Sequence, residues 1–373
     1  MKEYLLVIIT TLVLAWVRER TYVGSLHSLG TRNKDRLCML LIFLVLTLFL
    51  GLRRYYNDTD VYRAVYERAV GFPEFWETFS SALGDNPGFT IVQAWMKTVE
   101  IDSQSFLLLF TALSLGCTVY FLSTYSTNLV LTLFLFFTTN AYTLSAAAIK
   151  QSAAIALGMV AVSLWLKKRQ ILFVCTLLLA ASFHPYVLMY ALVPFLTFRP
   201  WSGKTYIMLA VFLAAGVALE SMLGVIVDVT TMIGDSYAEE DFIGSGINIF
   251  RVLVANVVLV LTFLYRKQLF RSSTRAENLM VNLAMLNGAI MFVGLFGTAI
   301  YFSRMASYFT FAQCLALPWV LSKLPSGRKT FYTLGMVAGY MGFFVYANMI
   351  SQSFTYNFSR MSLLEYVGQL GGR

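Results

Sequence analysis

Charge is scarce in this chain. Only 13% of its 373 residues are charged, whereas 58% are hydrophobic and the mean hydropathy is +0.69. This balance excludes a soluble globular protein of this length and indicates a membrane protein that crosses the bilayer several times. Proline is also rare, with 7 residues and no low-complexity tract, so the composition excludes a disordered chain.

Cysteine is nearly absent as well. Each of the four cysteines lies inside an apolar run, without a C-x-x-C pair: Cys38, Cys117, Cys175 and Cys314. We therefore expect small buried hydrophobic residues rather than disulfides or metal ligands. No other cluster of metal-ligand residues is present in the sequence, so we expect no cofactor and no metal.

Long apolar runs predict membrane-spanning helices, because backbone polar groups inside lipid must be hydrogen-bonded internally. We expect an all-α, polytopic membrane helical bundle with about 12 transmembrane helices, forming a single membrane domain over residues 1–373. The runs are 3–17, 37–52, 104–122, 128–143, 151–166, 171–184, 186–198, 205–228, 248–265, 279–299, 303–322 and 331–350. The first lacks an Ala-x-Ala cleavage site, so we interpret it as a retained span.

Positive charge is clustered in alternate loops, and the formal net charge is +9. The clusters are Arg18, Arg20, Arg32, Lys34 and Arg36; Lys167, Lys168 and Arg169; Arg199 and Lys204; Arg266, Lys267, Arg271 and Arg275; and Lys323, Arg328 and Lys329. The positive-inside rule makes these loops cytoplasmic and directs both termini outward. The positive charge is therefore an orientation signal, and we expect no nucleic-acid partner.

Two long loops lie on the predicted outer side. Residues 53–103 carry apolar side chains at helical spacing, with Phe72, Phe75, Trp76, Phe79 and Leu83 in one set and Phe89, Val92, Trp95, Met96 and Val99 in another. This pattern predicts two short amphipathic helices at the membrane interface, either packed as a lid or shaping a groove for a lipid tail. Residues 229–247 form an acidic loop without Lys or Arg; its acidic residues are Asp235, Glu239, Glu240 and Asp241.

The predicted outer side also carries isolated cations, which are costly near hydrocarbon and need a partner. Lys150 and Gln151 begin a span, and a helix N-terminus with a cation is a good anion site, although the lysine could instead reach outward to lipid headgroups. Arg251 and Arg304 lie at the starts of later spans. Their partners are either the carboxylates of loop 229–247 or a diphosphate, which suits the guanidinium group.

Two further motifs could carry chemistry. Asp58-Thr59-Asp60 has the D-x-D spacing of a divalent-metal site, but Asp58 could equally cap a helix that begins near Thr59. His184 precedes Pro185 at the outer end of a run. Its imidazole could transfer a proton near neutral pH, or it could be a structural residue.

These motifs, in this order, resemble the Wzy/EpsG-type bacterial polysaccharide polymerases. The matching segments are Arg53/Arg54 followed by Asp58-Thr59-x-x-Tyr62-x-x-x-Tyr66, Lys150-Gln151-Ser-Ala-Ala154, Phe183-His184, and Arg304-x-x-x-Tyr308-Phe309. Together they cover most of residues 50–310. Two positions depart from the family pattern: Lys150 replaces an arginine, and Pro185 follows the histidine.

The resemblance implies a GT-C-like enzyme in the bacterial plasma membrane, with its active site facing outward. Such enzymes join polyprenyl(undecaprenyl)-diphosphate-linked oligosaccharide repeats into O-antigen, capsule or exopolysaccharide. Transfer from a diphosphate requires cations at the leaving group and a base near the acceptor hydroxyl. We assign the diphosphate to Arg54, Lys150, Arg251 and Arg304, and the base to His184 or Asp58, with preference for His184. Arg53, Asp60, Tyr62, Gln151 and Tyr308 complete the expected substrate-binding set.

Three alternative functions remain open at this point. They are a flippase for lipid-linked oligosaccharides, a GT-C transferase that uses polyprenyl-phosphate sugars, and an O-antigen ligase. The expected partners are the lipid-linked oligosaccharide, membrane lipid, and chain-length regulator and flippase proteins. We also expect Arg54, Lys150, His184, Arg251 and Arg304 to converge on one outward-facing cavity.

Overall fold

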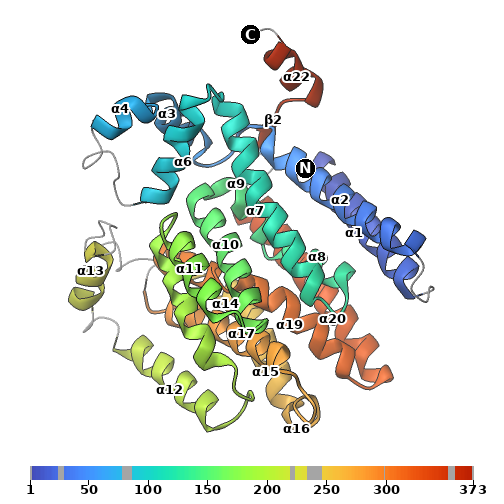
Figure 1. Cartoon of the computed structure of the whole chain (residues 1–373). Helices are drawn as coiled ribbons and strands as arrows, with labels where there is room; N and C mark the ends of the chain where they lie inside the picture. The colour runs from blue at the N-terminus through green and yellow to red at the C-terminus, as the bar shows by residue number, and fades with distance from the viewer. Residues whose placement is uncertain are drawn as a thin grey trace. The chain divides into compact units, whose positions relative to one another are not determined.

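The computed structural model describes residues 2–23, 29–77, 86–218, 223–232, 246–297, 299–351 and 358–371, which are helical except for short connections and one two-stranded sheet (Figure 1). The chain divides into two compact units. Unit 1 comprises Met1–Leu164, Arg169–Val187 and Phe344–Arg373, and unit 2 comprises Trp165–Lys168 and Leu188–Phe343.

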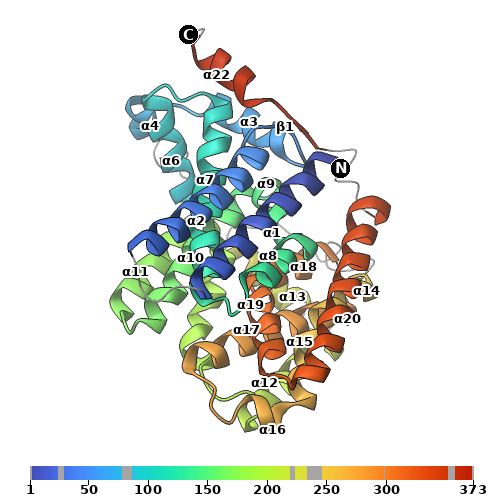
Figure 2. The same ribbon diagram turned by 90° about the vertical axis from the view of Figure 1, so that its right-hand side faces the viewer.

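Unit 1 is built around long apolar helices. They are α1 (Lys2–Val23), α2 (Leu29–Gly51), α7 (Ser103–Tyr125), α8 (Leu129–Thr138), α9 (Ala141–Ala147), α10 (Ile149–Leu166) and α11 (Gln170–Ala181). Helices α1 and α2 lie side by side, α2 also packs against α7, and α1 packs against α8 (Figure 2). The Tyr4 ring stacks on Phe49 and Tyr142, at centroid distances of 5.8 and 6.0 Å. Aromatic packing therefore joins α1, α2 and α9 in the core.

Within the segment 53–103, the structure describes residues 53–77 and 86–103, which form one strand and three helices. They are β1 (Arg53–Tyr55), α3 (Thr59–Arg68), α4 (Phe72–Glu77) and α6 (Pro87–Thr98). Helices α4 and α6 correspond to the two predicted amphipathic helices, whereas Phe79 and Leu83 lie outside the described residues. Trp76 and Trp95 remain 58% and 49% exposed, which is typical of aromatic side chains at a membrane interface.

The C-terminal part of unit 1 returns to the start of this segment. It contains η4 (Tyr346–Ser351), β2 (Ser359–Arg360) and α22 (Leu363–Gly371). Strands β1 and β2 pair antiparallel with Arg53 opposite Arg360, and the Met361 amide donates to the Leu52 carbonyl at 2.9 Å. Backbone hydrogen bonds thus tie the C-terminal segment to the residues that follow α2.

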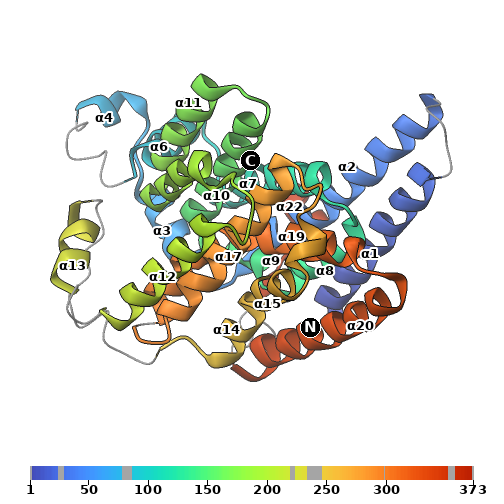
Figure 3. The same ribbon diagram turned by 90° about the horizontal axis from the view of Figure 1, so that it is seen from below.

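Unit 2 is centred on α17 (Arg275–Val293), which is largely buried. Its other elements are η1 (Pro185–Leu196), which begins in unit 1, and α12 (Gly203–Val217), α13 (Leu223–Met232), α14 (Ile249–Ala255), α15 (Val257–Leu264), α16 (Arg266–Leu269), α18 (Ala299–Ser307), α19 (Thr310–Lys323) and α20 (Ser326–Val345). Helices α12, α14, α15, α18 and α19 contact α17 (Figure 3). The buried Asn287 amide donates to the Ala306 carbonyl at 2.6 Å, which joins α17 to α18.

Four helices are long and apolar enough to cross a membrane, or five if the bent α8–α9 pair forms one span. They are Ser103–Tyr125, Ile149–Leu166, Arg275–Val293 and Ser326–Ile350. The predicted number of about twelve is therefore not confirmed in the described part of the chain.

Several predicted runs are broken; the run 248–265 divides into α14 and α15 at Asn256. The Asn256 side chain donates to the carbonyls of Val252 and Gly288, which stabilises this break.

One expectation for the cysteines is wrong. All four are free thiols, and Cys38 and Cys314 are buried, but Cys175 on α11 is exposed. A helix in a membrane can be apolar all round because its lipid-facing side needs no polar residues. An apolar neighbourhood in the sequence therefore does not predict burial inside the protein.

Candidate functional site

The Arg53 side chain lies inside the protein and joins three elements. Its exposed fraction is 0%, its Nε donates to Thr59 Oγ1 at 3.1 Å, and its Nη1 donates to the Leu50 carbonyl and to Thr111 Oγ1. Its Nη2 has no hydrogen-bond partner among the described residues. Burial, with a smaller contribution from Arg63, lowers the pKa of Arg53 to about 9, so the guanidinium remains charged at neutral pH.

Strand β1, the turn after it and the start of α3 each present one of the predicted side chains at the surface. Arg54, Asp58 and Asp60 are all exposed. The Arg54 guanidinium donates from Nη2 to Glu365 Oε1 of α22 at 3.0 Å. Arg53 and Arg54 are thus neighbours in sequence with opposite environments, and only the second is open to a ligand.

Helix α3 begins at Thr59, as the sequence predicts, but the alternative in which the Asp58 side chain caps it is wrong. Asp58 has φ −78° and ψ 15°, and its carboxylate accepts no capping hydrogen bond. A capping side chain requires a more extended backbone at that position. Thr59 Oγ1 instead stabilises the turn by accepting from the Tyr56 amide at 3.1 Å and donating to the Tyr56 carbonyl at 2.6 Å.

The D-x-D motif does not belong to a cluster of metal-ligand side chains. Within the described ranges, no group of three or more His, Cys, Asp or Glu residues is arranged to hold a metal ion. The donor set around Asp58 and Asp60 therefore gives no support to the divalent-metal interpretation of that spacing.

Lys150 lies in the first turn of a helix, where the sequence places it. The chain breaks at Ala148, whose φ is −134° and ψ 79°, and α10 begins at Ile149. The Lys150 Nζ lies 5.1 Å from the centroid of the Phe89 ring, within the range of a cation–π contact. The adjacent Gln151 is buried, with an exposed fraction of 3%.

Phe89 is the centre of an aromatic cluster that joins α3 and α7 to α6. Its ring lies 6.4 Å from Tyr62 of α3, and 6.0 and 5.1 Å from Phe106 and Phe110 of α7. The side chain itself is 1% exposed. The buried Phe89 ring of α6 therefore lies beside both Tyr62 and Lys150, two residues of the predicted site.

The start of α6 also packs closely against the segment that carries His184. The Gly88 amide donates to the Ser182 carbonyl at 2.9 Å, and a Cβ at Gly88 would lie only 2.1 Å from Ser182 Oγ. His184 follows α11 and is half-buried, with its ring 5.2 Å from that of Tyr186. Pro185 then begins η1. Helix α6 thus contacts both Lys150 and Ser182, which lies two residues before His184.

A pocket of about 370 Å³ opens beside Lys150, and we call it the Lys150 pocket. Its lining residues are Val65, Arg68, Ala69, Val70, Phe75, Phe89, Thr90, Gln93, Ala94 and Lys150. Gln93 is 3% exposed, and its Nε2 has no hydrogen-bond partner within the described residues. Two cations and a buried amide donor in an apolar pocket match an anion attached to an apolar group.

Arg68 and Gln93 are not predicted as site residues from the sequence. Gln93 lies one helical turn after Phe89, on the side of α6 that faces the protein. That spacing was the available signal, because a polar residue in register with a buried aromatic side chain requires a polar partner or a ligand.

In unit 2, the helices that carry Arg251 and Arg304 meet at Gly294. A Cβ on Gly294 would lie 2.4 Å from Ile247 Cδ1, just before α14, and 2.8 Å from Phe302 Cβ of α18. Arg251 is half-buried in α14, and Arg304 is exposed on α18. The absence of a side chain at Gly294 therefore allows the two arginine-bearing segments to approach each other.

Tyr308 lies at the junction of α18 and α19, where it is fully buried. Its carbonyl accepts a hydrogen bond from the Tyr190 hydroxyl, and the two rings are 6.3 Å apart in an edge-on arrangement.

Arg54, Lys150 and His184 belong to unit 1, and Arg251, Arg304 and Tyr308 belong to unit 2. Convergence of all five cationic residues on one cavity remains a prediction. Most of the acidic loop 229–247, including all four of its predicted acidic residues, lies outside the described residues.

Comparison with known proteins adds one finding. No curated protein and no solved structure matches this chain. A family model described as the EpsG family matches residues 36–366, which include the β1 turn, α10, His184 and Arg304. The chain therefore belongs to the EpsG family, a family of Wzy/EpsG-type polysaccharide polymerases.

Proposed function

We propose that this chain is a membrane glycosyltransferase that polymerises polyprenyl-diphosphate-linked oligosaccharide repeats on the outer face of the bacterial plasma membrane. The observation that carries this proposal is the Lys150 pocket. It combines two cations, Lys150 and Arg68, and the unpartnered donor of Gln93 with apolar walls. This combination suits a phosphate group attached to a hydrocarbon chain, because the charge and the apolar part each find a matching surface.

The proposed reaction exchanges one bond at the anomeric carbon of the growing glycan. The acceptor hydroxyl oxygen attacks that carbon, and the carbon–oxygen bond to the diphosphate breaks. The electron pair leaves with the diphosphate, and the hydroxyl proton passes to a base. Fixed cations favour the reaction because negative charge accumulates on the leaving group in the transition state.

We assign this chemistry to residues in both units. Lys150, Arg251, Arg304 and Arg54 bind diphosphate, together with Arg68 and Gln93 of the Lys150 pocket. His184 is the preferred base. The exposed Asp58 carboxylate is the alternative base. Tyr62, Asp60, Gln151 and Tyr308 contribute to substrate binding. Arg53 supports the turn from inside, since its hydrogen bonds hold the start of α3 against α2 and α7.

We further propose a GT-C-like bundle of about twelve spans with both termini outside and the basic loops in the cytoplasm. The isolated cations then face the outer side, where lipid-linked repeats are presented. Chain-length regulator and flippase proteins are the proposed partners. Labelling of single cysteines placed at Lys167 and at Ser103 from each side of the membrane tests this orientation. Outward labelling at Lys167 would contradict it.

The decisive experiment supplies purified protein with lipid-diphosphate repeat units as the only substrate. We expect a ladder of longer lipid-linked glycans that persists in the presence of a metal chelator. Arg304→Ala and His184→Ala abolish the ladder without loss of folded protein. Matched controls are Lys167→Ala and Arg271→Ala, which remove exposed cations in loops assigned to the cytoplasm.

The outcomes separate the competing functions. Intact substrate moved across the bilayer without a ladder indicates a flippase. Reaction only with polyprenyl-phosphate sugars indicates the other GT-C class, and reaction only with a lipid A core acceptor indicates a ligase. Full activity in both Arg304→Ala and His184→Ala refutes the site assignment even if the wild-type protein polymerises.

A further inference from the structure

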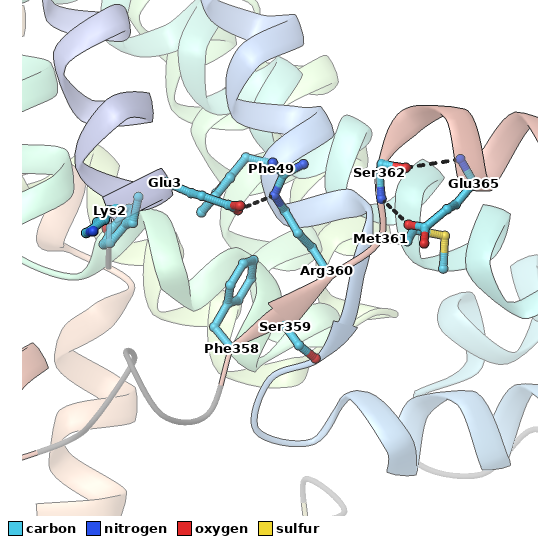
Figure 4. A pocket seen from close by; sticks show the side chains of 10 residues that line it. Lys2, Glu3, Phe49, Phe358, Ser359, Arg360, Met361, Ser362 and Glu365 are labelled. Atoms are coloured by element: carbon cyan, nitrogen blue, oxygen red, sulfur yellow. Dashed lines mark hydrogen bonds and ion pairs between the residues drawn. The ribbon is translucent and has the colours of Figure 1, made fainter.

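A second cavity, of about 670 Å³, lies in unit 1 where α1 begins and α2 ends, beside β2 and α22 (Figure 4). We call it the α22 pocket. Its lining residues are Lys2, Glu3, Tyr4, Phe49, Phe358, Ser359, Arg360, Met361, Ser362 and Glu365. Its volume is within the range of small-ligand sites. None of the catalytic or substrate-binding residues assigned above lines it.

One wall of the α22 pocket is aromatic and rigid. The rings of Phe49 and Phe358 stack with centroids 4.9 Å apart and an interplanar angle of 23°. Tyr4 also stacks on Phe49, at 5.8 Å and 9°. Phe49 and Tyr4 are 5% and 1% exposed, so the protein core holds this wall in place.

The polar part of the pocket consists of carboxylates paired with arginines. Glu3 Oε2 accepts from Arg360 Nε at 2.8 Å, and Figure 4 shows this pair beside Phe49. Glu365 accepts from Arg54 and from the Ser362 amide. The side chains of Glu3 and Glu365 are 65% and 52% exposed. Each carboxylate therefore keeps free lone pairs for a ligand while its charge is largely balanced.

We propose that the α22 pocket binds a saccharide, namely part of the glycan of the lipid-linked substrate; this inference rests on the proposed function. A sugar ring has apolar C–H faces that pack on aromatic rings, and hydroxyls that donate to carboxylates and accept from arginine. Among the lining residues, Lys2 and Arg360 are balanced by Glu3 and Glu365, so the pocket offers no net positive charge to attract a diphosphate. The chemistry of this pocket thus differs from that of the Lys150 pocket.

The α22 pocket is connected to the Arg53–Thr59 turn through the small sheet. Arg360 lies opposite Arg53 in the β1–β2 pair, and Arg54 binds Glu365 at the edge of the pocket. A glycan held there lies next to the exposed Arg54. Binding energy from sugar residues remote from the reacting carbon then retains the chain between successive transfers.

The test measures binding of glycan without its lipid. Oligosaccharide fragments, prepared by mild acid hydrolysis of the source bacterium's own surface polysaccharide, are titrated into the full-length protein in lipid nanodiscs. We expect Phe358→Ala and Glu3→Gln each to weaken binding about tenfold, because each removes a direct contact. Matched controls are Phe195→Ala, at a side chain that is 74% exposed in unit 2, and Glu77→Gln, at an exposed residue of α4.

Inorganic pyrophosphate provides the second arm. We expect it to leave glycan binding unchanged, whereas competition with the glycan would show that the pocket takes an anion and would overturn the inference. Absence of glycan binding to the wild-type protein, or wild-type affinity in both pocket variants, would also overturn it. A wild-type ladder with unaffected glycan binding in the variants refutes this inference alone. Loss of glycan binding in the variants without any wild-type ladder refutes the polymerase proposal alone.

Discussion

At the scale of single residues, the adjacent arginines Arg53 and Arg54 lie in different environments. Arg53 is fully buried and makes three hydrogen bonds, whereas Arg54 is exposed and forms one ion pair with Glu365. A buried guanidinium with several acceptors is costly to remove because its partners lose their donor inside the protein. An exposed ion pair contributes much less, since water solvates both groups when they separate.

Replacement of these two arginines separates stability from function. We expect Arg53→Ala to lower the free energy of unfolding by about 3 kcal/mol, from loss of buried hydrogen bonds to a charged group. Arg54→Ala should change it by less than about 1 kcal/mol but reduce polymerisation. Thermal unfolding in detergent and the ladder assay measure the two effects. Equal loss of stability in both variants would contradict the assigned difference.

Gln93 provides a test of the Lys150 pocket at the same scale. Its Nε2 is buried without a partner, so Gln93→Leu should leave thermal stability unchanged or raise it. The KM for lipid-linked substrate should rise about tenfold, because a donor to the phosphate is lost. Gln93→Glu should raise KM further by repulsion. An unchanged KM in both variants would exclude Gln93 from the site.

Glu365 of α22 makes its ion pair with Arg54 sensitive to pH. Hydrogen bonds from the Ser362 amide and hydroxyl, followed by the charge of Arg54, lower the pKa of Glu365 below its ordinary value of 4.5. A lowered pKa means that the folded state favours the carboxylate, so the contact is present at neutral pH and is lost as the pH falls through that lowered pKa. The protection of α22 amides against hydrogen exchange, corrected for the intrinsic exchange rate at each pH, should therefore fall in acid. Glu365→Gln should remove that dependence, and identical pH profiles would contradict it.

At the scale of secondary-structure elements, close backbone contacts position the candidate residues. Helix α6 reaches the end of α11 because Gly88 has no side chain, and the segments carrying Arg251 and Arg304 meet at Gly294 for the same reason. These contacts bring α6 against the segment before His184, and the segment before α14 against α18. Because of these contacts, Gly88 and Gly294 do not tolerate a larger side chain without displacement of their neighbours.

Substitution of Gly88 tests this packing directly. A Cβ there would lie 2.1 Å from Ser182 Oγ and 2.9 Å from Ser182 Cβ, so Gly88→Ala should cost about 1–3 kcal/mol of stability by overpacking. Activity should fall as α6 shifts away from α11. The double variant Gly88→Ala/Ser182→Gly should recover part of both. Gly335→Ala is the control, since a Cβ at that position meets nothing within 4 Å.

Local patterns predicted much at this scale, but not the orientation of helices. The start of α10 beside Lys150 and the helices α3, α4 and α6 follow from spacing and breaks in the sequence. The buried face of α6 does not, because Trp95 and Val99 of the predicted apolar set are 49% and 50% exposed. Lipid and protein interior are both apolar, so hydrophobicity alone cannot identify the face that packs inward. Gln93 was missed for that reason.

At the scale of the whole molecule, membership of the EpsG family and the isolated cations support one account of function. In the proposed function, the Lys150 pocket and His184 are assigned from unit 1 and Arg251 and Arg304 from unit 2, and the α22 pocket of unit 1 is the proposed saccharide site. A polymerase acts on a diphosphate, an acceptor hydroxyl and a glycan chain in one reaction. The chain contains groups suited to each of these three ligand parts.

The most direct test of this account is the stoichiometry of the products formed from purified lipid-diphosphate repeat units, measured by mass spectrometry. We predict lipid-linked glycans in whole multiples of the repeat, each retaining one polyprenyl diphosphate, with one free polyprenyl diphosphate released per new glycosidic bond. The Lys150→Ala variant should form neither product while remaining folded. Elongation that releases polyprenyl monophosphate, or no elongation by the wild-type protein, would contradict the account.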